Sequence, residues 1–541
     1  MATTHDSGDG PPPETPSQQS DGDNAPREPG SGLTRRQLLP LAGGGLIALA
    51  AAGAVGYELH PDAKQAAPAP KPTPTPTPTP KPATLPTTTL EKPFVSRPDL
   101  SPPTVRITQL ASGTSEETTP RFIALAPDNV IQGSTPWQQG LMLVDRLGRL
   151  VWFKPATQGR PFDLKLETYQ GKPALTWWEG GLVEDFGSGK AQIADATFNT
   201  IKTVSAANGL TMDLHEFAIT SSGAGLATAY HVTTGDLTPV HGAAHGRLLT
   251  CHAQVLDLAT GKATFDWNAL EHVAVQESYQ QVPGVGTDLY DYFHMNSLQM
   301  LSDGSLLVSA RNTWTVYRVN GSTGEIIWRM GGKKSDFQIE PAAQWAWQHH
   351  ATMWNATTMT VFDNSSTRNA PSRGLLLSVD ESAMTVSLTQ EFKSPTGFYV
   401  GTLGSVQLMP NGNVFVGWGT QPYFTEFAAD GTQLMFGQLP PGVRSYRAFL
   451  VDLVGAPADK PAIVAKVYAA GGYQIYVSWN GATEIDGWRI DAGPNAHALT
   501  PVGTSPWTGF ETVIIVDAVG PSFQAIALDA NGNELGSSEV V

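Results

Sequence analysis

Four short stretches of this chain combine histidine with side chains that bind anions. They are residues 212–217, 291–297, 309–312 and 347–351, and they carry His215, His294, Asn296, Arg311, His349 and His350. An imidazole can act as a nucleophile, and a guanidinium offers a planar, charged fork to sulfate, phosphate or carboxylate oxygens. An amide adds a donor where negative charge develops. Together these side chains predict the transfer of an oxyanion group without a cofactor.

Several other kinds of chemistry are disfavoured. A single histidine more often fills a core position, so the prediction depends on the recurrence of histidine stretches. A metal site is not expected, because the chain has no His-Glu-x-x-His or His-x-His spacing and no carboxylate-rich set. P-loop, Rossmann and Gly-x-Ser-x-Gly motifs are missing as well, which disfavours nucleotide-dependent and serine-hydrolase chemistry. His349 and His350 are neighbours, so on a strand only one of them would face the site.

Repeated hairpins must position these stretches. Between residues 105 and 454 the chain repeats a strand, a turn with aspartate and glycine, and an alternating strand that closes on an aromatic residue such as Trp152, Trp267 or Trp328. Such recurrence is typical of a β-propeller, and blades of roughly 50 to 60 residues would give about six of them. The sequence therefore predicts an all-β fold with a six-bladed β-propeller over residues 105–456. A β-helix or a pair of sandwiches is the alternative.

The last part of the chain has a different pattern. Residues 460–541 contain short alternating strands and, apart from His497, no histidine. The segment resembles a small fibronectin type III-like β-sandwich. We expect it to be structural or adhesive rather than catalytic.

The first hundred residues predict export. Residues 1–32 are polar and acidic and are expected to be a disordered tail. A pair of arginines then precedes the uncharged stretch 38–57, so residues 33–60 resemble a twin-arginine signal, with the general export route or a simple anchor as alternatives. The stretch is about as long as a bilayer is thick, so it would either stay as a single-pass membrane anchor or be cleaved. Residues 61–104 are rich in proline and threonine and predict an extended linker. We expect the protein in the cell envelope or outside the cell.

The net charge disfavours one class of partner, and the cysteine count limits the possible disulfides. The chain has 33 Lys and Arg residues against 49 Asp and Glu residues, a net charge of −16, which disfavours nucleic acid as a partner. The single cysteine, Cys251, excludes an intrachain disulfide. A twin-arginine substrate folds in the reducing cytosol, so it would not depend on disulfides. Cys251 is expected to be a buried small hydrophobe.

The motifs resemble those of the arylsulfotransferase family, nearest to its actinobacterial-type branch. The matching stretches are residues 175–180, 213–217, 291–297, 328–332, 348–349 and 362–364. The resemblance spans roughly residues 118–454 and implies a six-bladed propeller. It also implies transfer of a sulfuryl group from a phenolic sulfate ester to a phenol, through a sulfohistidine and without a nucleotide donor.

The resemblance also implies roles for single residues. His349 would be the nucleophile. His294, Asn296 and Arg311 would hold the sulfuryl oxygens, and His215 would donate to the sulfate or serve as acid and base for the phenol. The branch commonly has an aspartate after the nucleophilic histidine, where this chain has His350, so His350 is the alternative nucleophile. Dimerisation is not implied, because a proline-rich linker stands where periplasmic members have a β-rich domain.

Two other classes of function compete with sulfuryl transfer. One is a non-catalytic cell-surface propeller that binds a polymer or a protein, with the sandwich as a second adhesive module. The other is a propeller hydrolase or lyase that uses the same histidines on another anionic substrate. Arg311 and Asn296 beside the histidines favour the transferase, because a purely binding propeller has no need of them.

Overall fold

Strands joined by short turns make up the part of the chain that the computed structural model describes. This part is residues 94–111, 120–129, 136–184, 186–283, 289–517 and 520–541. The helices within it are one-turn 3-10 segments: η1 (Thr238–Val240), η2 (Ala269–Glu271), η3 (Val275–Glu277) and η4 (Pro341–Ala343). The predicted all-β class is confirmed.

The predicted tail over residues 1–32, the signal over residues 33–60 and most of the linker over residues 61–104 lie outside the described residues. Among the described residues, no helix has the length and apolarity needed to cross a membrane.

One four-stranded sheet joins the two ends of the region 105–456. Its order is β27-β2-β3-β4. The strands are β2 (Phe122–Asn129), β3 (Gly140–Asp145), β4 (Leu150–Pro155) and β27 (Val443–Val451). β27 pairs antiparallel with β2, with Phe122 opposite Val451. The last strand of the region therefore returns to pair beside the first hairpin.

The following strands form a nine-stranded sheet. They are β5 (Arg160–Tyr169), β6 (Lys172–Val183), β7 (Phe186–Ala194), β8 (Thr200–Val204), β9 (Thr211–Ile219), β10 (Gly225–Gly235), β11 (Gly246–Asp257), β12 (Lys262–Asn268) and β13 (Tyr290–Asp291). β7 and β9 meet through one residue pair, Gly189 with Met212. The sheet thus consists of two groups, β5–β8 and β9–β13, joined at a narrow bridge.

Three more sheets complete the region. The first holds β14 (Met295–Met300), β15 (Leu306–Ala310), β16 (Thr315–Val319) and β17 (Ile326–Gly331). The second holds β18 (Gln338–Ile339), β19 (His349–Asn355), β20 (Thr358–Asp363), β21 (Arg373–Asp380) and β22 (Thr385–Lys393). The third holds β23 (Ser405–Leu408), β24 (Val414–Gly417), β25 (Tyr423–Phe427) and β26 (Gln433–Gln438), with β1 (Arg106–Leu110) beside β26.

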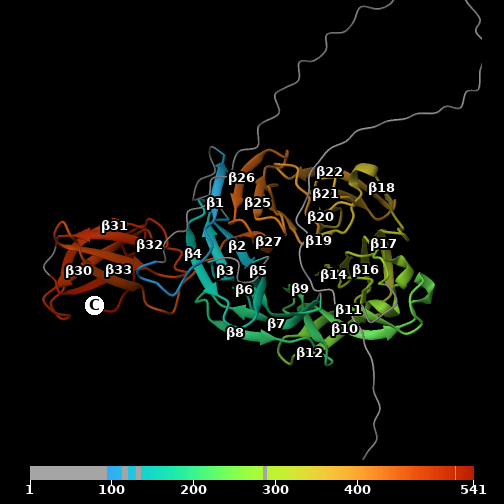
Figure 1. Cartoon of the computed structure of the whole chain (residues 1–541), viewed down its shortest axis with the longest axis horizontal. Coiled ribbons are helices and arrows are strands. Elements are labelled where there is room, and N and C mark those ends of the chain that lie inside the picture. The colour runs from blue at the N-terminus through green and yellow to red at the C-terminus, as the bar shows by residue number, and fades with distance from the viewer. Residues whose placement is uncertain (1–93, 112–119, 130–135, 185, 284–288, 518–519) are drawn as a thin grey trace, which may run out of the picture. The chain divides into compact units, whose positions relative to one another are not determined.

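Six strands from these sheets contact one another in series. β27 contacts β5, β5 contacts β9, β9 contacts β14, β14 contacts β19, β19 contacts β23, and β23 contacts β27. Figure 1 shows the sheets following one another in chain order around these strands. The series brings residues that are far apart in sequence to one central region.

Local turn chemistry explains the hairpins. At the turn from β3 to β4, the Asp145 carboxylate accepts the backbone N–H of Leu147 (3.0 Å) and of Arg149 (2.8 Å). Gly148 has φ +83°, and a Cβ there would lie 2.8 Å from the Val105 carbonyl oxygen. Aspartate and glycine are therefore required at this turn for different reasons, one to cap the backbone and one to bend it.

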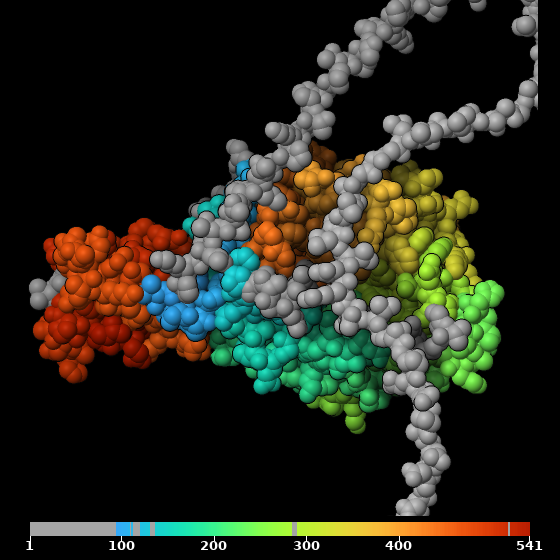
Figure 2. Space-filling view, in the orientation of Figure 1, coloured from blue at the N-terminus to red at the C-terminus, as the bar shows by residue number. Residues whose placement is uncertain are grey.

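Large apolar side chains fill the space between successive sheets, whose surfaces pass from blue-green to orange in Figure 2. Between β15–β17 and β19–β21, Trp328, Met330 and Val361 are buried in one cluster. Removing a side chain as large as tryptophan from such a core costs about 3–5 kcal/mol. This packing fixes the inner strands, which carry the histidine stretches.

The C-terminal strands form two further sheets. One is β28 (Ala462–Val467), β29 (Tyr473–Ser478) and β32 (Glu511–Val516). The other is β31 (Thr500–Pro506), β30 (Gly487–Gly493), β33 (Ser522–Leu528) and β34 (Glu534–Ser537). Ile475, Trp488 and Phe523, from both sheets, belong to one buried cluster. The Asn480 side chain bonds the backbone of Phe153 in β4 at 2.8 and 2.9 Å, which ties this part to the first sheet.

Candidate active site

His349 is held by hydrogen bonds at both ring nitrogens. It is the first residue of β19 and is buried. Its Nδ1 lies 2.7 Å from Oδ1 of Asn364 and 3.1 Å from the carbonyl oxygen of Trp347. Both partners are acceptors, so the proton of a neutral ring belongs on Nδ1. Nε2 accepts the backbone N–H of Leu403 at 3.1 Å. This arrangement leaves the lone pair of His349 on Nε2.

The surroundings of His349 keep it neutral. Burial lowers the pKa of His349 well below its ordinary value, and the positive charge of Arg311 lowers it further. The hydrogen bond to Asn364 acts in the opposite direction but does not reverse the shift, while His294 and His215 add to it. A neutral imidazole is the nucleophilic form, and the lone pair on Nε2 of His349 is available once the Leu403 N–H is displaced.

His215 and His294 each carry a carboxylate partner on Nδ1. His215 in β9 bonds Asp213, and His294, directly before β14, bonds Asp291. The two rings meet edge to face with centroids 4.7 Å apart. A carboxylate on Nδ1 orients an imidazole and leaves Nε2 to exchange a proton with another group.

The charges around this pair shift two pKa values. Burial lowers the pKa of His294 although Asp291 favours its charged form. Burial alone would raise the pKa of Asp213, but His215 and the backbone N–H of Gly187, at 2.6 Å, bring it below its ordinary value. Asp213 is therefore an anion that orients a histidine.

Arg311 provides a positive charge without an ion-pair partner. It directly follows β15, and its backbone N–H donates to the His294 carbonyl at 2.9 Å. Its guanidinium donates to Asn312 Oδ1 (2.7 Å) and to the Gly401 carbonyl (3.3 Å), and Nε has no hydrogen-bond partner among the described residues. Burial lowers its pKa, and no described carboxylate lies within 4.0 Å of it. A partly buried guanidinium that forms no ion pair can bind an anion.

Asn296 forms structural hydrogen bonds beside His349. Its amide nitrogen donates to the carbonyl of Gln348 at 2.6 Å, directly before His349. Its backbone carbonyl accepts from Arg447 at 2.8 Å. Asn296 thus ties β14 to the start of β19, and its expected contact with sulfuryl oxygens stays a prediction.

His350 lies on the other side of β19. Its Nδ1 is 3.1 Å from the carbonyl oxygen of Val406. Burial and the positive charge of Arg447 lower the pKa of His350 to about 3, although Glu216 opposes this. The groups that act on His350 are thus different from those that act on His349. His349, and not His350, lies with His215, His294 and Arg311.

The charged groups beside His350 form what we call the ionic hub: Asp163, Lys165, Glu216 and Arg447. Arg447 lies 3.1 Å from Asp163 and 3.0 Å from Glu216, and Lys165 contacts both carboxylates. Burial alone would raise the pKa of Glu216, but Arg447 and Lys165 lower it to about 2. In the hub every charge has an opposite charge beside it.

The backbone around the site is strained. His294, Trp347, His350 and Leu403 have φ values of +58°, +53°, +48° and +69°. Left-handed conformations cost roughly 1–3 kcal/mol for residues other than glycine, and they concentrate at functional sites. His349 and His350, which are consecutive on β19, point into different regions.

Sequence reasoning missed the residues that orient the histidines. Asp213 and Asp291 stand two and three positions before His215 and His294, so the spacings Asp-x-His and Asp-x-x-His were a usable signal. Asn364 belongs to the stretch 362–364 that resembles the family, but its contact with His349, fifteen residues earlier, was not predicted. The Leu403 N–H is a backbone group, which no side-chain pattern indicates.

Comparison with known proteins identifies the family. The model of the family described as Arylsulfotransferase (ASST) matches residues 165–438, about half of the chain, and this range includes all of the candidate site residues. The chain belongs to the arylsulfotransferase family. Aryl sulfotransfer is the activity that this membership supports, and the actinobacterial-type branch stays a prediction. No curated protein matches the chain.

Solved structures resemble this arylsulfotransferase only distantly. A protein of unknown function from Bacteroides caccae has 10% identity and a TM-score of 0.36, covering 61% of this chain and 99% of its own. A putative 6-phosphogluconolactonase from Bacteroides fragilis has 14% identity and a TM-score of 0.32, covering 62% and 100%. Virginiamycin B lyase from Staphylococcus aureus has 9% identity and a TM-score of 0.30, covering 69% and 94%. Values this low add nothing to the assignment of the site.

Proposed function

We propose that this arylsulfotransferase moves a sulfuryl group from a phenolic sulfate ester to a phenol through a sulfohistidine on His349. The observation that carries the proposal is the partly buried guanidinium of Arg311, which forms no ion pair among the described residues, beside the neutral imidazole of His349. An aryl sulfate is an anion and needs a positive pocket. Its sulfur needs a nucleophile that is not protonated at neutral pH.

The first half-reaction follows from the tautomer of His349. The Nε2 lone pair forms a bond to sulfur, the bond between sulfur and the aryl oxygen breaks, and the phenoxide leaves with the bonding pair. Nδ1 keeps its proton, donated to Asn364, so the sulfated ring stays hydrogen-bonded. Arg311 faces the charge on the peripheral sulfuryl oxygens. The Leu403 N–H, which occupies Nε2 when no sulfur is there, must be released by the incoming sulfur.

The second half-reaction needs a base. The acceptor phenol loses its proton to Nε2 of an aspartate-paired histidine, and its oxygen attacks sulfur. The bond between sulfur and Nε2 of His349 then breaks, and the lone pair returns to the ring. The resemblance implies this role for His215, which Asp213 holds. His294 is the alternative base, because it is neutral, is held by Asp291, and lies against the His215 ring.

We further propose that the sheets of the region 105–456 are the blades of a six-bladed propeller. The serial contacts of β27, β5, β9, β14, β19 and β23 support this, because each strand opens one group of four strands or, for β27, completes it. The site then lies where these inner strands converge. The two C-terminal sheets fit a fibronectin type III-like sandwich, which stays a proposal.

We propose that the enzyme acts outside the cytoplasm, as the pair of arginines before residues 38–57 indicates. Its partners would be small phenols and phenolic sulfates, with a membrane contact only if the stretch 38–57 is retained. Fractionation of cells that express the full chain tests this. Activity confined to the cytosol would contradict it.

The direct test of the function uses the purified full chain with 4-nitrophenyl sulfate and phenol. We expect continued nitrophenol release, beyond one equivalent per enzyme, to depend on phenol, with phenyl sulfate as the second product. Continued release without phenol would indicate a hydrolase instead, and no release would favour a binding propeller.

A further inference from the structure

Three aromatic side chains form a wall that begins at Arg311. The guanidinium carbon of Arg311 lies 4.7 Å from the ring centroid of Trp347. The Trp347 ring meets Trp314 at 5.3 Å and 75°, and Trp314 stacks on Tyr279 at 3.8 Å and 9°. We call Trp347, Trp314 and Tyr279 the aromatic wall. The wall starts at Arg311, where we expect the anion to bind, and each ring contacts the next.

The near end of the wall is fixed beside the nucleophile. The carbonyl of Trp347 accepts from Nδ1 of His349 at 3.1 Å, so the first ring of the wall belongs to the residue that also orients the imidazole. The wall therefore begins next to the position that the sulfur or hydroxyl of a substrate would occupy at His349.

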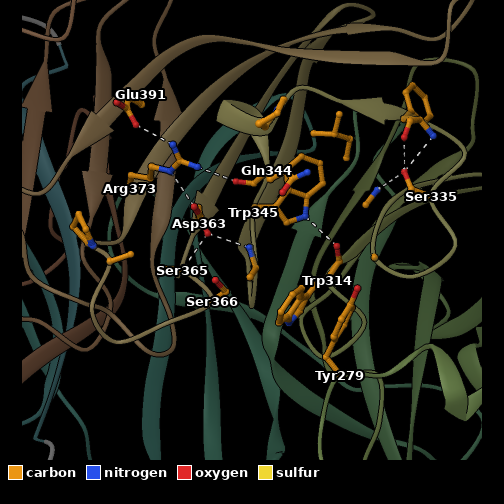
Figure 3. A pocket seen from close by; sticks show the side chains of 18 of the residues that line it. Tyr279, Trp314, Ser335, Gln344, Trp345, Asp363, Ser365, Ser366, Arg373 and Glu391 are labelled. Atoms are coloured by element: carbon orange, nitrogen blue, oxygen red, sulfur yellow. Dashed lines mark hydrogen bonds and ion pairs between the residues drawn. The ribbon is translucent and has the colours of Figure 1, made fainter. Parts of the chain in front are cut away.

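The far end of the wall lines a pocket of about 740 Å³. Tyr279 and Trp314 lie face to face at one side of it, and the Trp345 indole, which donates to the Trp314 carbonyl at 3.1 Å, lies above them (Figure 3). Phe337 adds a further apolar wall. This volume falls within the range of about 300–1,000 Å³ typical of small-molecule sites.

The charged side chains of this pocket are paired with one another, whereas Arg311 has no ion-pair partner among the described residues. Arg373 pairs with Asp363 at 3.0 Å and with Glu391 at 2.9 Å, and Lys393 lies 2.5 Å from Glu391. Two cations and two carboxylates therefore neutralise one another. The pocket suits an uncharged ligand with aromatic surface, and it does not suit a second anion.

We propose that this pocket binds the distal ring of a multi-ring phenol, whose hydroxyl end lies at His349. The inference rests on the proposed function and adds the substrate class: uncharged phenols of two or more rings rather than single-ring phenols. The aromatic wall would contact the acceptor between its two ends.

Binding without any sulfate donor tests the subsite separately from the reaction. Isothermal titration of the full chain with 4-phenylphenol and with phenol should give an affinity for the two-ring compound at least about tenfold higher, equivalent to about 1.4 kcal/mol, since 4-phenylphenol adds contact with one more aromatic ring. Equal affinity for the two phenols would overturn the proposal. So would binding of an uncharged disaccharide in place of 4-phenylphenol.

Substitution locates the subsite. Trp314→Ala should remove the preference for 4-phenylphenol and leave the affinity for phenol within about twofold. Trp354→Ala is the matched control, because Trp354 is 50% exposed and lies outside the pocket. If Trp314→Ala unfolds, which thermal melting will show, Tyr279→Leu makes the same test from the outer ring. Retention of the preference in the folded variant would overturn the proposal, even in a protein that fails to transfer sulfate.

Discussion

Strand β19 separates two buried regions that use similar residues in opposite ways. On one side, His349 lies with His215, His294 and the unpaired guanidinium of Arg311. On the other, His350 lies against the ionic hub, where Arg447 contacts two carboxylates. Histidine, arginine and aspartate occur on both sides, so composition does not distinguish them.

The difference is in charge balance. In the hub each charge is compensated, and such a network holds neighbouring strands together. In the candidate site, Arg311 forms no ion pair among the described residues; Asp291 attracts it from beyond 4.0 Å and bonds His294 instead. A guanidinium without a paired carboxylate can take the oxygens of an incoming anion. The two regions thus differ in how their charges are paired rather than in their residue types.

The largest expected effect contrasts the two adjacent histidines. His349→Ala should lower kcat/KM for 4-nitrophenyl sulfate by at least about a thousandfold, because the nucleophile is lost. His350→Ala, the matched control one residue away, should retain activity within about tenfold. Steady-state kinetics on folded proteins measure both. The reverse ranking would assign the reaction to the other side of β19.

The next effect contrasts the two arginines in stability. Arg447→Met should lower the free energy of unfolding by about 3–5 kcal/mol, because it leaves the buried carboxylates of Asp163 and Glu216 with Lys165 as the one hub cation between them. Arg311→Met should destabilise the fold much less, because Arg311 forms no ion pair among the described residues. Urea denaturation of both variants tests this, and equal losses would mean that Arg311 is also structural.

Arg311 should matter for the reaction instead. Arg311→Gln removes the charge that faces the sulfuryl oxygens, and we expect kcat/KM for the donor to fall by about a hundredfold. Arg318→Gln is a control, because Arg318 already pairs with Asp303 and Glu381. A loss in Arg318→Gln that matches the loss in Arg311→Gln would show that the effect is not specific to the site.

The smallest effect is a shift in pH dependence. Burial and Arg311 lower the pKa of His349, so the nucleophile of the wild type stays neutral below the ordinary histidine pKa. A positive neighbour lowers a histidine pKa, so removing Arg311 raises it, and the acid limb of kcat/KM in Arg311→Gln should move to higher pH. An unmoved limb would indicate that another group controls it.

Much of the fold was predictable because the sequence features that indicate strands and turns lie within a few residues of one another. Alternating strands and Asp/Gly turns such as Asp145 and Gly148 act within a few residues, and they gave the all-β class. The contact of β27 with β5 and its pairing with β2 were not, because each joins residues hundreds of positions apart.

The site was predictable to a similar extent. The histidines, Asn296 and Arg311 stand in short stretches that can be noticed, and the structure brings His215, His294, Arg311 and His349 together. That Asn364 and a backbone N–H hold His349, and that Arg447 faces His350, depends on packing between sheets. No spacing along the chain encodes it.

The most direct test of the central claim is to locate the sulfuryl group on the trapped enzyme. The full chain is mixed with 4-nitrophenyl sulfate in the absence of acceptor, quenched in alkali and examined by intact-mass and peptide mass spectrometry. We predict one added SO₃ group, carried by His349 and discharged by phenol. An adduct on His350, or turnover without any adduct on His349, would contradict the account.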